Sequence, residues 1–193
     1  IFIFPDIENQ FKRGDIGSIL HEHINYFTFK SAKFLFENCG FEIIDGSTYK
    51  DEITLFCKKK EINHKNIIKV DKEEVEELSN NFSLMVEKIY LNKKKVMDFH
   101  LKDMKIGFHG ACNALSNFLY LSKLHEIKDF FIFDGDDLKS NTYLPMSQNK
   151  ILHCSKKHYK DMDILFIAAS TFSKEITSYA KGLIKSQNII DLF

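Results

Sequence analysis

The chain has 193 residues, of which 44% are hydrophobic and 28% are charged, with 27 basic and 27 acidic side chains. A folded protein of this size buries roughly 70% of the surface that its unfolded chain exposes, so the composition predicts a packed core rather than a disordered chain. The balanced charge supplies no field that would attract nucleic acid or an anionic lipid surface, so we expect neither as a partner.

The four cysteines are far apart in the sequence and form no CxxC pair, which argues against a structural zinc site or a dense disulfide framework. No apolar run approaches the roughly 18 residues that a membrane span requires, and no signal segment opens the chain. We therefore expect a cytoplasmic protein with reduced thiols and no membrane association.

The first 60 residues read as the closing portion of an α/β sheet. The chain opens on the apolar run "IFIF", which is typical of a buried strand, and this opening without a preceding element suggests a piece of a longer protein. A helix is predicted over 31–38, with Gly40 as its left-handed stop. The runs "FEIID" and "ITLFCKK", joined by the turn-rich "GSTYKDE", predict an antiparallel pair.

Residues 61–103 read as a linker followed by one long helix, because apolar residues recur at helical spacing from Asp71 to about His100. From Met104 the pattern alternates between strands and helices, the last helix running over 173–185. The strand candidates are "MKIGF", "FFIFDGDD", "NKILH", "DILFIAAS" and "NIIDLF". This alternation predicts a Rossmann-like parallel α/β domain over 104–193, and the fold class of the chain is α/β.

A glycine turn is expected after the first of these strands. Gly107 and Gly110 would sit just after the strand and open a helix, with Phe108 and His109 filling the turn. Asp134 ends the next strand, where an acidic residue would meet a ribose. The full GxGxxG spacing is missing, so three interpretations stay open: a structural turn, a site for a free dinucleotide, and a site for a nucleotide-bearing substrate.

The segment "HEH", formed by His21, Glu22 and His23, places three ionisable groups together. They are solvated loop residues, metal ligands, or a general base with its supports. A metal site is disfavoured because the histidines alternate at i and i+2, without HExxH spacing or a third ligand cluster nearby. A base fits the chemistry better, since histidine titrates near neutrality and a neighbouring glutamate can orient its ring.

These residues also carry a resemblance to a known family. The segments that carry it are "FPDIE", "HEHINYFTFKSAKFLFENCGFEIID", "GFHGACNALSNFL", "FDGDDLKSNTYLP" and "DILFIAASTFSKEI". In order and spacing the chain resembles the sugar C-methyltransferases that use S-adenosyl-L-methionine (SAM). The likeness spans nearly the whole chain, and "HEHxxYF" is its most specific part.

The resemblance implies a parent protein with a zinc-binding N-terminal domain, a central SAM-binding domain and this C-terminal portion. Ranges 1–60 and 104–193 would then be the end of a class I methyltransferase domain and the C-terminal Rossmann-like domain. The glycine-rich SAM loop would lie upstream of Ile1, so the isolated chain is expected to be inactive. The substrate implied is a nucleotide-linked keto sugar.

The resemblance also implies roles for particular residues. His23 would remove the proton alpha to the ketone, Glu22 would support the base or the enolate, and His21 and Tyr26 would shape the pocket. Substrate contacts are assigned to Gly107, His109, Gly110, Asn113, Asp134 and Tyr143. The chain departs from the family at Leu20, where family members often carry a tyrosine that can donate a hydrogen bond.

Two other functions stay open at this point. A non-catalytic Rossmann-like module could hold a nucleotide sugar or a protein partner and keep the motif as scaffold. An oxidoreductase would require nicotinamide binding at Gly107 and Gly110.

Overall fold

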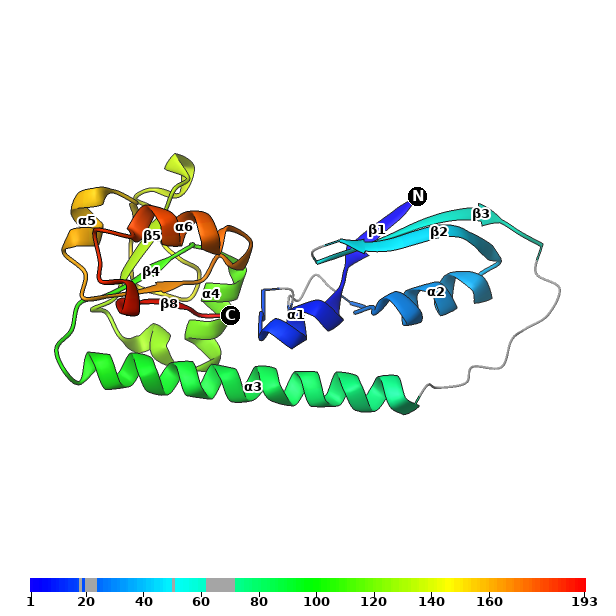
Figure 1. Cartoon of the computed structure of the whole chain (residues 1–193), viewed down its shortest axis with the longest axis horizontal. Helices are drawn as coiled ribbons and strands as arrows, with labels where there is room; N and C mark the ends of the chain where they lie inside the picture. The colour runs from blue at the N-terminus through cyan, green and yellow to red at the C-terminus, as the bar shows by residue number, and fades with distance from the viewer. Residues whose placement is uncertain (18, 20–23, 50, 62–71) are drawn as a thin grey trace. The chain divides into compact units, whose positions relative to one another are not determined.

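The computed structural model describes residues 1–17, 19, 24–49, 51–61 and 72–193. They divide into two compact units, Ile1–Gly14 with Leu20–Met85, and Asp15–Ile19 with Val86–Phe193. Helix α3 (Lys72–His100) contributes to both units and confirms the prediction of one long helix (Figure 1). Most of the predicted linker lies outside the described residues, and the predicted division into 1–60, 61–103 and 104–193 stays a prediction.

The first unit is built on a three-stranded sheet in the order β1-β3-β2, in which β3 is antiparallel to both neighbours. Its elements are β1 (Phe2–Pro5), α1 (Ile7–Arg13), α2 (Phe29–Asn38), β2 (Phe41–Tyr49) and β3 (Glu52–Lys59). The expected first strand, helix and antiparallel pair are confirmed. The predicted turn was too long, because residues 46–49 continue β2 and pair with β3.

Local capping sets the limits of α2. The Thr28 Oγ1 accepts a hydrogen bond from the Ser31 amide, and the Ser31 Oγ accepts one from the Thr28 amide, which forms a capping box. The helix therefore begins two residues before the predicted start at residue 31. At its other end Gly40 takes a φ of 84°, as predicted for the stop. The helix covers one face of the sheet, where Ala32, Ile53 and Leu55 are fully buried.

The second unit contains five parallel strands in the order β6-β5-β4-β7-β8. Its elements after α3 are β4 (Ile106–His109), α4 (Asn113–Leu121), β5 (Phe131–Asp134), β6 (Ile151–His153), α5 (Lys156–Lys160), β7 (Ile164–Ile167), α6 (Ser173–Ala180) and β8 (Ile189–Asp191). The strands come in the predicted order and confirm the α/β class. The parallel sheet, flanked by helices, is compatible with a Rossmann-like fold.

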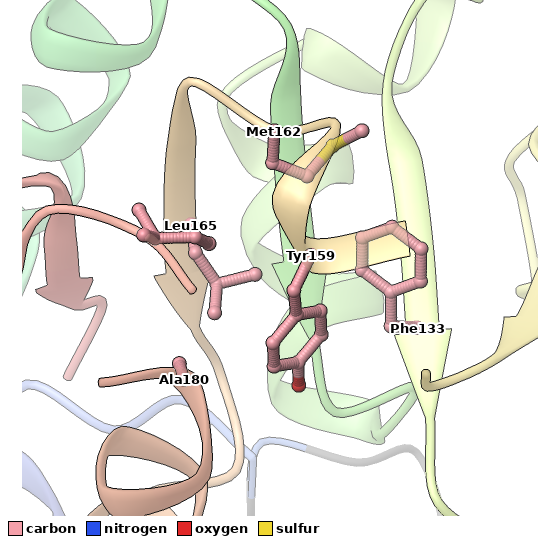
Figure 2. Packing of buried hydrophobic residues seen from close by; sticks show 6 residues of the cluster. Phe133, Tyr159, Met162, Leu165 and Ala180 are labelled. Carbon is pink, nitrogen blue, oxygen red and sulfur yellow. The ribbon is translucent and has the colours of Figure 1, made fainter. Parts of the chain in front are cut away.

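Helices cover both faces of this parallel sheet. On one face Phe108 stacks on Phe166, and Phe99 of α3 contacts the Phe166 ring. On the other face α5 and α6 pack on a cluster that includes Phe133 and Tyr159 (Figures 1 and 2). All four residues of β4 and of β7 are buried, as expected for strands covered on both sides.

The prediction of a helix over 173–185 was wrong at its end. Helix α6 stops at Ala180, and Gly182 takes the left-handed conformation with a φ of 81°. Lys181 already leaves the helical conformation with a ψ of 133°, and glycine adopts the left-handed conformation that follows without a steric penalty. The segment after α6 is therefore a turn that leads into β8.

Candidate functional site at the carboxyl ends of the parallel strands

The order of the parallel strands marks one place for a site. From β4 the chain adds β5 and β6 on one side and then β7 and β8 on the other, so the strand order reverses between β4 and β7. In open α/β sheets ligands bind beyond the carboxyl ends of the strands at such a reversal. We call this part of the second unit the carboxyl edge.

The turns that follow β4 and β7 touch at the carboxyl edge. Gly110 has a φ of 105°, and a Cβ atom placed on it would lie 2.7 Å from the Ala169 Cβ and 2.8 Å from the Ala169 amide nitrogen. Real Cβ atoms essentially never come so close to other atoms. Gly110 is therefore required by the close approach of the two turns.

The predicted extent of the glycine turn was wrong. Gly107, Phe108 and His109 are residues of β4, and the turn begins only at Gly110. Gly107 is buried at a position where a Cβ atom would lie 2.7 Å from Cε2 of Phe133 and 3.2 Å from Cγ of Met162. Its lack of a side chain makes room for the core, and its assigned substrate contact stays a prediction.

Asp134 ends β5, as predicted, and its carboxylate holds two turns together. Oδ2 accepts hydrogen bonds from the Ala111 amide at 2.8 Å and from Lys139 Nζ at 3.0 Å, while Oδ1 accepts one from the Asp136 amide at 2.9 Å. Burial opposes ionisation, but these hydrogen bonds outweigh it and hold the pKa of Asp134 below its usual range. The carboxylate is thus charged at neutral pH and joins the turns after β4 and β5.

His109 lies at the end of β4 with 8% of its surface exposed. Its Nδ1 is hydrogen-bonded to the hydroxyl of Tyr159, a fully buried residue of α5. Burial lowers the pKa of His109 to about 4, and the negative charge of Asp134 opposes this only in part. The imidazole is therefore neutral at physiological pH.

The low pKa of His109 makes folding depend on pH. The unfolded value is near 6.5 and the folded value about 4, so the unfolded chain binds more protons between these values and stability rises with pH across this window. We expect the unfolding free energy of the second unit to fall by about 2 kcal/mol from pH 8 to pH 5 through His109. Urea titrations at several pH values measure the unfolding free energy. His109→Gln should remove the part of its pH dependence that comes from His109. An identical pH dependence in the variant would contradict the assignment.

A segment far away in the sequence completes the carboxyl edge. The Asp15 carboxylate, 7% exposed, accepts hydrogen bonds from the Ser170 hydroxyl at 2.7 Å and from the Gly17 amide at 2.8 Å. Asn117 of α4 donates to the carbonyl oxygens of Ile16 at 2.8 Å and Ile19 at 2.9 Å. Residues 15–19 are therefore part of the second unit, which the sequence did not predict.

The remaining predicted site residues belong to different parts of the chain. Asn113 is the exposed first residue of α4 and so lies at the carboxyl edge. Tyr143 forms an antiparallel bridge with Lys150 ahead of β6, at the amino end of that strand. Tyr26 belongs to the first unit and is 42% exposed. His21, Glu22 and His23, together with Leu20, lie outside the described residues.

The two cysteines of the carboxyl edge do not supply a thiolate. Burial raises the pKa of Cys112, which precedes α4, and of Cys154, which follows β6. Both side chains are therefore neutral thiols at physiological pH. The ionisable side chains described at this edge include those of His109, Asp15, Asp134 and Lys139.

Two cavities lie away from the carboxyl edge. One of about 350 Å³ lies at the amino ends of β4 and β5 in the second unit, and one of about 340 Å³ lies in the first unit beside Asp6 and Gly46. The amino ends of parallel strands are not where α/β sheets bind ligands, so we place the candidate site at the carboxyl edge.

No protein-family model matches the chain, and no curated protein gives a match. Among the residues that the structure describes, no group of three or more His, Cys, Asp or Glu side chains is placed to hold a metal ion. None of the described helices has the length and apolar character needed to cross a membrane.

Proposed function

We propose that the chain is the C-terminal portion of a SAM-dependent C-methyltransferase that acts on a nucleotide-linked keto sugar. The second unit binds the nucleotide sugar at its carboxyl edge, and His23 is the base. One observation carries the proposal: residues 15–19 are hydrogen-bonded to the carboxyl edge through Asp15 and Asn117. In the sequence the HEH motif follows this segment after Leu20.

The three-stranded sheet of the first unit supports the same proposal. β1 and β2 are both antiparallel to β3, so they are parallel to each other with a reversed strand between them. This is the arrangement that we expect where a class I methyltransferase sheet ends. In the proposal the strands and the glycine-rich loop that bind SAM belong to sequence upstream of Ile1.

The proposed chemistry assigns one proton transfer to this chain. His23 takes the proton from the carbon alpha to the ketone, the C–H electron pair forms the enolate, and Glu22 stabilises the resulting imidazolium. SAM supplies the methyl group that the nucleophilic carbon receives. A neutral imidazole is a weak base for such a carbon, so the enolate oxygen requires a hydrogen-bond donor, and Leu20 cannot provide one.

A non-catalytic binding module is the second candidate, and the hydrogen bonds of the Asp134 carboxylate favour it. This group already accepts hydrogen bonds from Ala111, Asp136 and Lys139, as a purely structural residue would. In that case the carboxyl edge would hold a nucleotide sugar without chemistry. Reduced thiols fit a cytoplasmic location for either candidate, since all four cysteines are free.

Methyl transfer separates the two candidates. In the proposal this chain is part of a longer protein, which should transfer a labelled methyl group from SAM to a nucleotide-linked 4-keto sugar. Because the SAM loop is proposed to lie upstream, the 193-residue chain alone should show no SAM affinity by calorimetry. Micromolar binding of SAM by the chain alone would refute the proposed position of the SAM site. If a longer protein binds SAM and the nucleotide sugar but transfers no methyl group, the binding module is the better explanation.

A further inference from the structure

The hydroxyl group of Tyr159 has one partner among the residues that the structure describes. Tyr159 is fully buried between Phe133 and Ala180, and its hydroxyl points away from Met162, toward the carboxyl ends of the strands (Figure 2). There it is bonded to His109 Nδ1. A buried hydroxyl carries one proton that needs an acceptor, and leaving it without one costs about 1–3 kcal/mol.

This single contact determines where the imidazole proton lies. If Nδ1 carried the proton, it would donate to the Tyr159 oxygen, and the tyrosine proton would have no acceptor among the described side chains. If Tyr159 donates, Nδ1 accepts and both groups are satisfied. A neutral imidazole has one N–H, so the proton of His109 then lies on Nε2.

The Nε2–H of His109 is left without a partner among the described residues, on a side chain that is 8% exposed at the end of β4. We propose that His109 is a ligand-binding donor whose Nε2–H bonds an uncharged oxygen of the nucleotide sugar, and that Tyr159 is the positioning residue that keeps the proton on Nε2. The identity of the ligand rests on the proposed function, whereas the position of the proton does not.

The charges around the site favour an uncharged oxygen over a phosphate. The turn after β5 carries Asp134, Asp136 and Asp137, and of these Asp134 is neutralised by Lys139, while Asp137 lies 3.0 Å from His153 Nδ1. These carboxylates make the turn after β5 acidic, and the neutral imidazole would bring no compensating charge for a phosphate. A carbonyl or hydroxyl oxygen of the sugar or the base needs only the N–H.

The groups that act on His109 keep it neutral. From β5 the Asp134 carboxylate favours the imidazolium, but burial outweighs it and lowers the pKa to about 4. From α5 Tyr159 contributes an undissociated hydroxyl, because burial raises its pKa above the usual range. The donor is therefore present unchanged across the physiological pH range.

Nitrogen NMR of the full chain tests the position of the proton. Long-range ¹H–¹⁵N spectra at pH 7 should show an unprotonated Nδ1 and a protonated Nε2 for His109, assigned by the loss of these signals in His109→Gln. Tyr159→Phe keeps the packed ring and should yield a mixture of both tautomers. Tyr179→Phe is the matched control, because Tyr179 contacts the Tyr159 ring without bonding His109. A proton on Nδ1 in the unmodified chain, or no change in Tyr159→Phe, overturns the proposal.

Ligand titration tests the donor role. UDP-, dTDP-, GDP- and CDP-glucose are added to the full chain, and one of them should shift the Nε2–H signal, whereas pyrophosphate should not. His109→Leu should weaken that binding roughly tenfold, while His109→Gln, which keeps an N–H at that place, should retain it. No shift with any nucleotide sugar, or the same shift with pyrophosphate, overturns the donor role. If a nucleotide sugar shifts the Nε2–H signal but the longer protein transfers no methyl group, the proposed enzyme activity is wrong and the donor role of His109 stands.

Discussion

His23→Asn should lower the rate of the proposed methyl transfer about 10²- to 10⁴-fold in the proposed longer protein, the range typical of a lost general base. Asparagine keeps the approximate size and one hydrogen-bonding group of the side chain, but it accepts no proton near pH 7. SAM affinity should stay unchanged, because in the proposal His23 acts on the sugar and the SAM loop lies upstream of Ile1. Turnover with a nucleotide-linked keto sugar, together with solvent exchange at the carbon alpha to the ketone, measures the effect.

His21→Asn is the matched control for this substitution. The two histidines stand at i and i+2, so in an extended segment they point to opposite sides, and His21→Asn should cost much less. Equal and small effects of both substitutions would make the HEH motif a structural loop and favour the binding module. A severe loss in His21→Asn alone would keep the enzyme class but reassign the base.

In the proposed methyltransferase, the residue that donates a hydrogen bond to the enolate oxygen is a second determinant of the rate, because the side chain of Leu20 cannot donate one. Removing a donor to a developing oxyanion costs about 3–4 kcal/mol in enzymes where it has been measured. A chain that carries leucine at this position must obtain the donor from another residue or act on a different substrate. Restoring a hydroxyl by Leu20→Tyr would therefore change the rate only if no replacement donor exists.

The strands of the second unit were predictable because each is a short apolar run between polar turns. In a parallel sheet that is covered on both faces, burial alone selects such runs, so "DILFIAAS" and "FFIFDGDD" stand out without knowledge of their partners. The long helix α3 was predictable for a similar reason, since its apolar spacing extends over many turns.

Gly107 shows where local patterns fail. Glycines near the end of a strand usually mark a turn, but Gly107 is a residue of β4, where Phe133 of the adjacent strand β5 fills the space of a side chain. The hydrogen bond of Asp15 could not be predicted either, since its partner Ser170 is 155 residues away. Neither contact leaves a signal in a single sequence, because both depend on which strands and turns become neighbours.

The position of Asp134 was predicted correctly, and its predicted contact with a ribose stays a prediction. The sequence put an acidic residue at the end of β5, where a ribose would meet it, whereas the structure shows the carboxylate engaged by Ala111, Asp136 and Lys139. Position follows from the strand pattern, but hydrogen-bond partners follow from the fold of the two adjoining turns. In His109, at the end of the adjacent strand β4, the Nε2 atom has no hydrogen-bond partner among the described residues.

Gly110→Ala should lower the unfolding free energy of the second unit by about 2–5 kcal/mol. A side chain at a φ of 105° costs roughly 1–2 kcal/mol, and its overlap with Ala169, 2.7 Å from the new Cβ, adds about 1–3 kcal/mol of overpacking. This is a large share of the roughly 5–15 kcal/mol that stabilises a typical domain. Urea denaturation at pH 7, followed by circular dichroism, measures the loss.

Gly182→Ala separates backbone strain from the clash between the turns. Gly182 has a φ of 81°, but a Cβ atom placed on it would meet no other atom within 4 Å, so the substitution should cost only the roughly 1–2 kcal/mol of the left-handed conformation. Ala169→Gly in the Gly110→Ala background should restore part of the loss, because it removes the Ala169 Cβ but leaves the amide nitrogen 2.8 Å away. If Gly110→Ala costs no more than Gly182→Ala, the turns after β4 and β7 do not meet, and the carboxyl edge cannot have the form on which the His109 site depends.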